Sequence, residues 1–592
     1  MRLFLKFSGA LYWKFSAKQS HRLLQFGFNF MLGLVTAFAG GLATAMGATV
    51  DSVQFPPDFG WCVATAAHQI EGGNTNSDHY IWETGAINRV ISNEVLPNPD
   101  VNANFVTAIA ASSSFSANNH ACPVLKSEDP DPLRQHSRLF DSNLDSQRRL
   151  CEFSGDAIDH WRRVPGDIAL MKELGIKEYR LSVEWAKIEP QKGVFDQAAL
   201  QHYATEIRLL KAAGIEPQVT LFHFTMPQWL RSEGGWESPR SPELFGRFTR
   251  VVYSAIGSDV RTWYTMNEPM VHVTAGYVAG VLPPGEISPQ KIPIVLSNML
   301  RAHAAAYHAI HDQATLQEHF VQVGVAHHLR IFDPLTESAR WNQVDKLVER
   351  KIERFGASTA DYLWNWMLFD AIETGRLWFN FSQISSAAHK LGIKLPPFLN
   401  FQPIDVQGLK GTQDFFGLNY YTRDLVEFDL QGLLRGKSSL FENFHTRVNP
   451  VAVAAHNIND MGWEIYPNGL YRTLKALDAR GKLHSQLKRQ IIISENGIAD
   501  RSDLKRERFL KDHLREMSQA MQEGIPVAGY CHWTLVDNFE WNSGYSPKFG
   551  FYEVDLKTQE RRLRPSGQWY SLMIQNHGWS DSAAFKRAPL DP

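Results

Sequence analysis

The chain has 592 residues, is 44% hydrophobic and carries 60 basic against 62 acidic residues, a net charge of −2. A chain of this length can bury a large core, and its balanced charge gives no reason to expect a nucleic-acid partner. Four cysteines are too few for a disulfide scaffold. The sequence contains neither a CxxC nor an HExxH pattern, so we expect no metal site and no cofactor.

The first 50 residues differ from the rest of the chain. No acidic residue occurs before Asp51, and five basic residues precede an uncharged stretch that runs from Phe26 to Val50. This stretch is long enough to span a bilayer, and an Ala-Thr-Ala run near its end is typical of a signal-peptidase site. We therefore predict that residues 1–50 are a signal peptide or a membrane anchor. The protein would be exported or membrane-anchored, with residues 26–50 as its membrane contact.

From Val53 onward, apolar runs rich in β-branched and aromatic residues alternate with amphipathic stretches. We expect eight strands, in the segments 60–67, 178–185, 216–224, 261–267, 321–329, 415–422, 490–496 and 527–535. Eight continuous apolar strands separated by helices predict a closed parallel sheet, the (β/α)8 TIM barrel of the α/β class. The barrel would form one domain over residues 51–580, followed by a tail at 581–592.

The segments between the strands carry helix and loop signals. Four apolar residues of the segment 165–177 lie close to helical spacing, and Gly175 is placed as a C-terminal cap. The charged run at 503–516 is predicted to be the solvated face of a helix. Two long interruptions, at 84–155 and 376–412, lack periodicity, and we expect both to be loops around the barrel mouth.

The four cysteines fall into two groups. Cys62 and Cys531 lie inside expected strands, and we expect both to be small buried hydrophobic side chains, as free cysteines usually are. Cys122 and Cys151 bracket the polar part of the first interruption. A disulfide between these two is open if the compartment is oxidising.

Two of the expected strands end in a polar cluster that contains one glutamate. The run "WYTMNEP" at 263–269 contains Glu268, and "QIIISENG" at 490–497 contains Glu495. The carboxyl ends of barrel strands meet at one mouth, where catalytic groups converge. We therefore expect these two glutamates to lie together although they are far apart in the sequence.

A pair of carboxyl groups at the mouth suits the cleavage of a glycosidic bond. One group protonates the leaving oxygen while the other attacks the anomeric carbon or activates water. The two tasks need opposite protonation states at one pH. We expect burial to raise the pKa of the acid, and a nearby arginine, for which Arg180 is the candidate, to hold the nucleophile ionised.

Six segments together resemble glycoside hydrolase family 1 β-glycosidases, over about residues 53–575. They are "FPPDFGWCVATAAHQIEGG" (55–73), "LFHFTMPQWL" (221–230), "TMNEP" (265–269), "GLNYYT" (417–422), "SENG" (494–497) and "GYCHWTLVDNFEWNSGYSPKFGF" (529–551). They occur in the family's order and on the expected strands, which makes the resemblance specific. It implies a retaining reaction by double displacement through a covalent glycosyl-enzyme, with the two carboxyl groups about 5–5.5 Å apart.

The resemblance also implies a role for each site residue. Glu268 would be the general acid/base and Glu495 the nucleophile, while Asn267 would bind the sugar 2-hydroxyl. Arg180 and Tyr421 would contact Glu495 and set its charge and orientation. The remaining residues would hold the sugar: Gln69, His223, Glu540 and Trp541 at its hydroxyls and Trp533 as the stacking floor beneath the ring.

Some positions depart from the commonest family pattern. Phe224 and Glu184 resemble an archaeal-type branch, Ser494 replaces the common threonine, and Cys62 replaces a glycine. Glu540 stands where phospho-glycosidases carry a serine. This favours unphosphorylated β-D-glucosides or β-D-galactosides as substrates, and the sequence leaves the choice of epimer open.

Two other functions remain open from the sequence. A membrane-associated transglycosidase would move the β-glycosyl group to a lipid or alcohol acceptor, so that a glycolipid would join the β-glycoside as a partner. Plant chloroplast galactolipid galactosyltransferases of this family have a run similar to "GYSPKFG" at 544–550 and an N-terminal hydrophobic segment. The other alternative, a non-catalytic sugar-binding module, would have lost a catalytic glutamate, whereas Glu268 and Glu495 are both present.

Overall fold

The chain divides into two units. The computed structural model describes residues 52–91, 152–335, 345–378, 402–428, 444–484 and 489–580. One unit comprises Met1–Gln54 and Gly578–Pro592, and the other comprises Phe55–His577. Several predictions fall outside the described residues, namely those on residues 1–50, on most of 84–155, on Cys122 and Cys151 and on the tail at 581–592.

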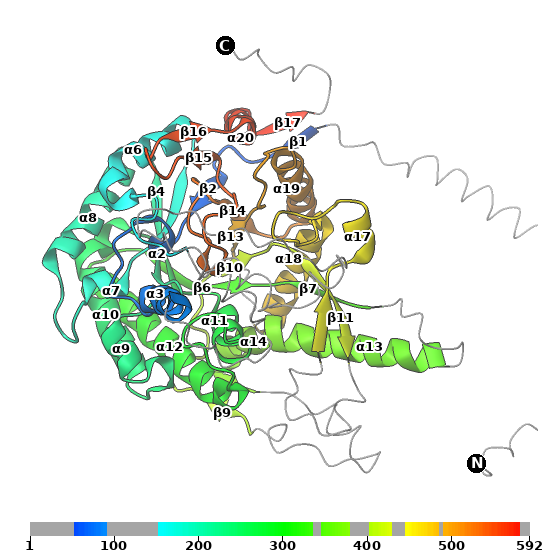
Figure 1. The fold of residues 1–592 in the computed structure, drawn as a ribbon, viewed down its shortest axis with the longest axis horizontal. Helices are drawn as coiled ribbons and strands as arrows, with labels where there is room; N and C mark the ends of the chain where they lie inside the picture. The colour runs from blue at the N-terminus through cyan, green and yellow to red at the C-terminus, as the bar shows by residue number, and fades with distance from the viewer. Residues whose placement is uncertain are drawn as a thin grey trace, which may run out of the picture. The chain divides into compact units, whose positions relative to one another are not determined.

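Eight parallel strands close into a barrel within the larger unit (Figure 1). In order around the barrel they are β2 (Gly60–Ala64), β3 (Glu178–Ser182), β4 (Glu216–Phe222), β5 (Thr262–Asn267), β6 (Gln322–His328), β10 (Phe416–Asn419), β13 (Ile491–Asn496) and β14 (Val527–Trp533). Each strand lies in one of the eight predicted segments, so the predicted TIM barrel is confirmed. β14 pairs with β2 and closes the ring.

The barrel strands are buried almost throughout. Every residue of β2, β5, β10 and β13 is buried, including the three consecutive isoleucines of β13. Strands covered on both faces need continuous apolar runs rather than alternation. Each isoleucine removed from water contributes about 1.5–3 kcal/mol to the stability of the fold.

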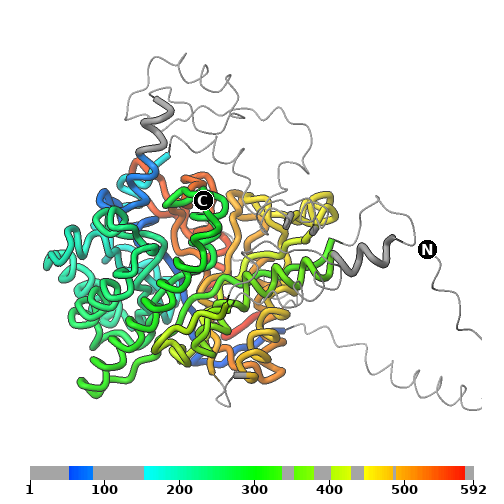
Figure 2. Tube along the Cα trace, turned by 90° about the horizontal axis from the view of Figure 1, so that it is seen from below, coloured from blue at the N-terminus to red at the C-terminus, as the bar shows by residue number. Residues whose placement is uncertain are grey.

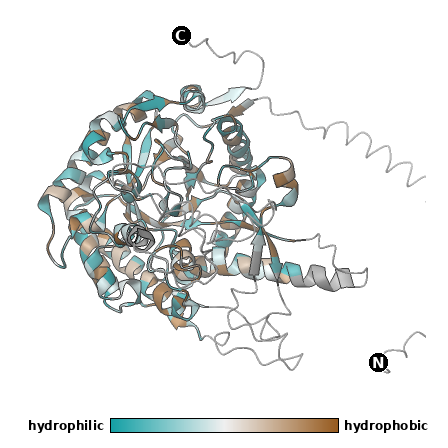
Figure 3. Cartoon of the chain, viewed as in Figure 1, coloured by the Kyte–Doolittle hydropathy of each residue, from teal (hydrophilic) through white to brown (hydrophobic). Residues whose placement is uncertain are grey.

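Helices surround the barrel (Figures 1 and 2), and Figure 3 shows hydrophilic and hydrophobic residues on the same helices. The longer ones are α6 (His160–Glu173), α8 (Gln197–Ala212), α10 (Ser241–Ile256), α12 (Ile292–Leu316), α13 (Asp345–Asp361), α18 (Pro467–His484), α19 (Arg506–Gln522) and α20 (Pro565–Gln575). The shorter ones are α2 (Ala67–Ile70), α7 (Trp185–Ile188), α9 (Gln228–Ser232), α11 (Pro269–Tyr277), α14 (Met367–Thr374) and α17 (Pro450–Ala454). Within the described ranges, no helix is both long and apolar enough to cross a membrane.

Two of the predicted segments end at other residues than the helices that the structure shows there. The helix expected at 165–177 is α6, which begins five residues earlier, at His160, and ends at Glu173. Gly175 caps it with φ +77°, and its N–H donates to the carbonyl of Lys172 at 3.0 Å. The helix α3 (Asp78–Ile91) continues into the first interruption, so residues 84–91 are helical rather than loop. The apolar residues of "GAINRVI" continue the helical spacing there, which explains the difference.

Small sheets lie outside the barrel. A three-stranded sheet contains β12 (Phe444–Arg447), β11 (Arg423–Phe428) and β7 (Ile331–Pro334), in that order. Two antiparallel pairs are β15 (Tyr552–Val554) with β16 (Arg561–Leu563) and β8 (Arg376–Leu377) with β9 (Ile404–Asp405). The β8–β9 pair lies in the interruption predicted at 376–412. In the smaller unit, β1 (Ser52–Gln54) pairs with β17 (Gly578–Ser580).

The first and last barrel strands are joined covalently. Cys62 of β2 lies opposite Cys531 of β14 in the parallel register, and the two form a disulfide. Both side chains are fully buried, but the prediction that they are free is wrong. The two residues are 469 positions apart, so only closure of the barrel brings them together.

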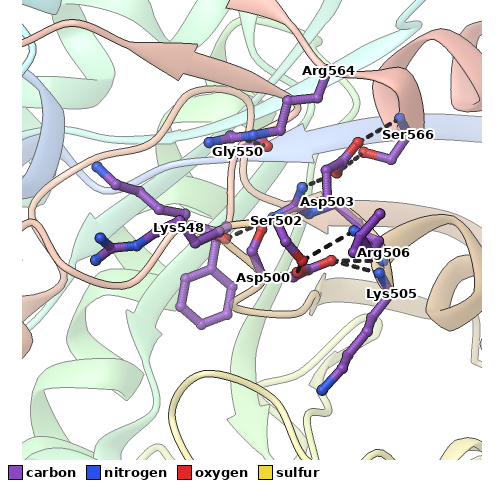
Figure 4. A network of polar contacts seen from close by, with 12 residues as sticks. Asp500, Ser502, Asp503, Lys505, Arg506, Lys548, Gly550, Arg564 and Ser566 are labelled. Atoms are coloured by element: carbon purple, nitrogen blue, oxygen red, sulfur yellow. Dashed lines mark hydrogen bonds and ion pairs between the residues drawn. The ribbon is translucent and has the colours of Figure 1, made fainter.

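The charged run on α19 is only partly solvated. Arg508 is 88% exposed, as predicted, whereas Arg506 is fully buried. Arg506 donates to the carbonyl oxygens of Asp500 at 2.8 Å and Lys548 at 2.6 Å, and it pairs with Asp503 (Figure 4). The prediction is therefore wrong for Arg506, which ties the loop after β13 to the loop after β14.

Candidate active site

The two glutamates singled out in the sequence lie at the carboxyl ends of their strands. Glu268 follows β5 directly, Glu495 is the penultimate residue of β13, and both are buried. The pairing register of β5 with β6 and of β13 with β14 shifts near each glutamate. Such irregularities re-aim side chains beside active sites. Glu268 also has φ +45°, a left-handed conformation that costs about 1–3 kcal/mol and that marks functional positions in many proteins.

Both carboxylate oxygens of Glu495 accept hydrogen bonds. Arg180 donates from Nη1 to Oε1 at 2.5 Å, and the hydroxyl of Tyr421 donates to Oε2 at 2.8 Å. The other terminal nitrogen of Arg180 donates to Oδ1 of Asn267 at 2.7 Å. The structure thus brings together four of the residues that the sequence singled out. Charge-assisted bonds of this kind fix a carboxylate in both charge and orientation.

Glu268 is held through one oxygen by two residues that the sequence analysis did not single out. Asn419 donates from Nδ2 to Oε1 at 2.7 Å, and Nδ1 of His328 lies 3.1 Å from the same oxygen. Ser494 in turn donates to Oδ1 of Asn419 at 2.6 Å. Asn419 and His328 each end a barrel strand, as Asn267 does. The rule that polar strand ends converge could therefore have found both.

The pKa values of the two glutamates are shifted in opposite directions. Burial raises the pKa of Glu495 to about 7, and the charge of Glu268 adds to the rise, whereas Arg180 and Tyr421 oppose it. Burial also acts to raise the pKa of Glu268, but His328 and Asn419 outweigh it and the pKa lies below its usual value. The predicted order, with the pKa of the acid raised and that of the nucleophile held low, is therefore reversed in the free protein. The physical reason is the imidazole of His328, which the sequence analysis did not consider as a neighbour of Glu268.

Gln69 and Glu540 are hydrogen-bonded to each other, and the side-chain oxygen of Gln69 is unpaired among the described residues. Gln69 donates from Nε2 to the carbonyl of Phe539 at 2.8 Å and to Oε2 of Glu540 at 3.1 Å. Its Oε1 is buried and has no hydrogen-bond partner among the described residues. Burial raises the pKa of Glu540 to about 8, and Glu495 adds to the rise while Gln69 opposes it. A buried amide oxygen without a partner is costly, so this oxygen marks a place for a ligand hydroxyl or water.

The rings of His223, Trp533 and Trp541 lie close to one another. The ring of His223 lies 6.1 Å from that of Trp533 and 6.1 Å from that of Trp541. Trp533 also packs with Tyr421 in a buried cluster. Burial lowers the pKa of His223 well below its usual value and Arg180 adds to the effect, so this imidazole is neutral. Its Nδ1 is buried without a partner in the part of the chain that the structure describes.

One group of side chains in the described segments has the composition of a metal site. His68, His79 and Glu83 place one ligand atom each within 4.8 Å of one another. However, Nε2 of His68 lies 2.8 Å from Oε1 of Glu83, so two of the three candidate ligand atoms are already hydrogen-bonded to each other. Burial acts to lower the pKa of His68, but Glu83 outweighs it and the pKa is raised. The geometry is that of a buried ion pair, and the ring of His68 stacks on Trp541 at 5.8 Å.

The site as a whole can exchange a proton and attack an electrophilic carbon. One carboxyl group is fixed through both oxygens, a second is held through one, and their charges interact. Unpaired amide and imidazole atoms and two indoles lie around them. Two carboxyl groups in such a setting are the machinery of glycoside hydrolysis.

Comparison with known proteins agrees with this chemistry. The sequence model of glycosyl hydrolase family 1 matches residues 141–579 of the chain. The chain belongs to glycosyl hydrolase family 1. It is therefore a glycoside hydrolase, a retaining β-glycosidase on a TIM barrel. The membership favours hydrolysis over the transglycosidase and the non-catalytic module that the sequence left open.

Several relatives share most of their length with this family 1 chain. A β-glucosidase A from Acetivibrio thermocellus is 32% identical over 439 residues, which are 72% of this chain and 89% of that protein. A β-glycosidase structure from Pyrococcus horikoshii superposes with a TM-score of 0.66 at 28% identity, covering 90% of this chain and 97% of that one. A β-glucosidase from Thermotoga maritima in complex with castanospermine gives a TM-score of 0.64 at 27% identity, covering 89% and 100%.

Proposed function

We propose that this β-glycosidase hydrolyses unphosphorylated β-D-glucosides or β-D-galactosides, with Glu495 as the nucleophile and Glu268 as the general acid/base. The observation that carries the assignment is the different way in which the two carboxyl groups are held. Arg180 and Tyr421 occupy both oxygens of Glu495, as suits an anion that must attack from a fixed position. Glu268 is held through Oε1 alone. Its Oε2, which has no hydrogen-bond partner among the described residues, can reach a substrate oxygen.

The reaction follows from these positions in two steps. First, an oxygen of Glu495 bonds to the anomeric carbon while the bond to the leaving oxygen breaks, and Glu268 gives its proton to that oxygen. Second, water attacks the anomeric carbon, its proton passes to Glu268, and the bond to Glu495 breaks. The two inversions return the β configuration. The coupled carboxyls titrate as a pair, so the order of their pKa values in the free protein does not fix which one delivers the proton to a bound glycoside.

Unpaired atoms around the carboxyls are suited to sugar hydroxyls. Oδ1 of Asn267 already accepts from Arg180 and Asn419, which leaves its amide nitrogen to donate to the 2-hydroxyl. Oε1 of Gln69 and Nδ1 of His223 would each gain a partner from a hydroxyl. A site with buried groups of this kind rejects analogues that lack the hydroxyl, because the groups would then stay unpaired.

Two further features bear on the sugar. The indole of Trp533 would cover the apolar face of the ring, and Trp541 with Glu540 would bind hydroxyls further from the bond that breaks. Three carboxyl groups interact at this site, because the charges of Glu495 and Glu268 both act on Glu540. A sugar 6-phosphate would place a dianion beside them, which supports an unphosphorylated substrate.

The test compares Glu495→Ala and Glu268→Ala with the wild type on a 2,4-dinitrophenyl and an alkyl β-glucoside. Glu495→Ala should abolish turnover of both. Glu268→Ala should lose the alkyl substrate but still form the glycosyl-enzyme from the aryl substrate, whose leaving group needs no proton, and then hydrolyse it slowly. An equal loss on both substrates would contradict the role of Glu268. The matching aryl β-galactoside ranks the two epimers.

We also propose that residues 1–50 direct export or anchor the protein, with residues 26–50 as the membrane contact. The missing acidic residues and the long apolar stretch support this. The disulfide between Cys62 and Cys531 adds support, because disulfides persist in oxidising compartments. The N-terminus of the mature protein and its partition between membrane and soluble fractions test the proposal. An intact N-terminus on a protein in the cytosolic fraction would contradict it.

A lipid or alcohol acceptor is the less favoured use of the same intermediate. A hydroxyl group of the acceptor would replace water in the second step, and a glycolipid would then be a second partner. The run at 544–550 is the feature that supports this alternative. The ratio of β-linked transfer product to free sugar, measured with and without a glycolipid acceptor, tests it. Free sugar in excess under all conditions would rule transfer out as the main activity.

A further inference from the structure

Two neighbouring strands hold the same oxygen of Glu268. His328 ends β6 and Asn419 ends β10, and the two residues face each other in the parallel register. Both reach Oε1 of Glu268, at 3.1 Å and 2.7 Å. The backbone of Glu268 is also fixed to β6, the strand of His328, since its N–H donates to the carbonyl of Ala326 at 2.8 Å. The contact with His328 is therefore part of the barrel mouth and does not depend on a surface loop.

The imidazole of His328 is itself held on several sides. Nε1 of Trp364 donates to the backbone carbonyl of His328 at 3.1 Å, and the indole meets the imidazole edge-on at 5.9 Å. Trp364 lies on η4 (Tyr362–Trp366), a π-helical turn of the kind that often occurs at functional sites. The ring of Tyr421 lies 5.8 Å away on another side. Nε2 of His328 is buried and has no partner among the described residues.

Few charged groups face this imidazole. Glu268 is in hydrogen-bond contact, and the hydroxyl of Tyr421 is already bound to Glu495. Asp424 of β11 also feels the charge of His328, but it lies 3.0 Å from the guanidinium of Arg330. Arg330 therefore supplies the positive charge that pairs with Asp424. Glu268 is therefore the carboxyl group that responds most directly to the charge of His328.

We propose that His328 is a positioning residue that orients Glu268 through Oε1 and sets the upper pH limit of the glycosidase activity. The proposal rests on the role of Glu268 as acid/base given above. A protonated imidazole beside a carboxyl favours the ionised carboxylate, so Glu268 gives up its proton at a lower pH and is the stronger acid. With Oε1 bound by His328 and Asn419, Oε2 is the oxygen left to carry the proton that Glu268 would donate to the leaving oxygen. The cost is an earlier loss of activity as the pH rises.

The test is the pH dependence of kcat/KM for His328→Gln, which keeps an N–H donor but does not titrate. On an alkyl β-glucoside, the basic limb should move upward by about 1 pH unit, because the charge that favours ionised Glu268 is gone. On a 2,4-dinitrophenyl β-glucoside, whose leaving group needs no proton, the basic limb should not move. His327→Gln is the matched control, because Nε2 of His327 is bound to Gln413 at 2.9 Å and not to Glu268.

Two outcomes would overturn the proposal. An unchanged basic limb in a His328→Gln protein of normal thermal stability would show that the imidazole does not act on the acid. A uniform fall in kcat/KM at every pH would reduce His328 to a structural role. Glu268→Ala, measured in parallel, separates this failure from that of the proposed function. If it lost both substrates equally, the acid/base role of Glu268 itself would be wrong.

Discussion

Arg180 and Glu495 form a buried ion pair at the centre of the site, with 2.5 Å between Nη1 and Oε1 and with 0% and 5% of their side chains exposed. Burying two charges is costly, and their attraction repays the cost only when further hydrogen bonds complete the pair. Tyr421 completes it on the carboxylate and Asn267 on the guanidinium. The barrel thus uses part of its stability to hold one carboxylate in one orientation.

Removing the hydroxyl of Tyr421 should weaken this arrangement. A hydrogen bond to a charged group contributes about 1.5–3 kcal/mol, so Tyr421→Phe should lower kcat/KM about 10- to 100-fold. Tyr420→Phe is the control, because the hydroxyl of Tyr420 donates to the backbone carbonyl of Tyr466 at 2.7 Å, away from Glu495. Steady-state kinetics on an aryl β-glucoside check both. Equal losses in the two variants would contradict the assigned contact.

Glu540→Gln should raise the stability of the protein and lower its catalytic activity. The folded pKa of Glu540 is raised to about 8, chiefly by burial, above an unfolded value of about 4.3. Its contribution to stability is therefore full below pH 4 and is lost as the pH rises to about 8. The Tm advantage of Glu540→Gln should be smallest at pH 4, grow until about pH 8 and then level off.

The same variant should lose about 10-fold or more in kcat/KM, because the amide presents one oxygen to the sugar hydroxyls where the carboxyl group, protonated or not, presents two. Thermal melts across pH and kinetics at pH 7 test the two effects separately. A Tm difference that does not change with pH would refute the raised pKa. Unchanged kinetics would remove Glu540 from the sugar site.

The disulfide between Cys62 and Cys531 should contribute to stability rather than to chemistry. Disulfides of this kind contribute about 2–5 kcal/mol, so the Cys62→Ala/Cys531→Ala protein should melt at a lower temperature and keep its activity at 25 °C. A reductant present through the melt should lower the Tm of the wild type but not that of the double variant. Alkylation of both cysteines in peptides from unreduced wild-type protein would show that the bond does not form.

Arg506 and Arg508 test how far the charged run on α19 is structural. Arg506→Met removes the cationic partner of buried Asp503 and one donor to each of two backbone carbonyls, so it should cost about 3–5 kcal/mol in unfolding free energy. Arg508→Met changes an exposed side chain and should cost less than about 1 kcal/mol. Urea unfolding of both variants makes the comparison. A similar cost for the two would mean that the buried network of Figure 4 contributes little.

The barrel could be predicted because eight largely apolar segments recur along the chain, separated by amphipathic stretches. The isoleucines of β13 indicate a strand buried on both faces without any knowledge of its neighbours. The pairing of Cys62 with Cys531 could not be predicted, because it depends on the register between the first strand and the last. The burial of Arg506 escaped for a similar reason, since its partners come from two loops that are distant in the sequence.

The site was predictable to the extent that strand-end glutamates and family motifs identify it. Glu268 and Glu495 stand out because each follows an apolar run with an asparagine beside it. His328 follows another histidine at the end of β6, and a histidine in an apolar run is more often a satisfied core residue than a functional one. Its contact with Glu268 requires the distance between two strand ends, and so does the order of the two pKa values.

The most direct test of the central claim is proton NMR of the first product released from an aryl β-glycoside, recorded before mutarotation. Protein lacking residues 1–50 would be used, so that the apolar segment does not interfere. The β-anomer should appear first, because attack by Glu495 and then by water inverts the anomeric carbon twice. If the α-anomer appeared first, the reaction would involve a single inversion, and the roles assigned to Glu495 and Glu268 would be wrong.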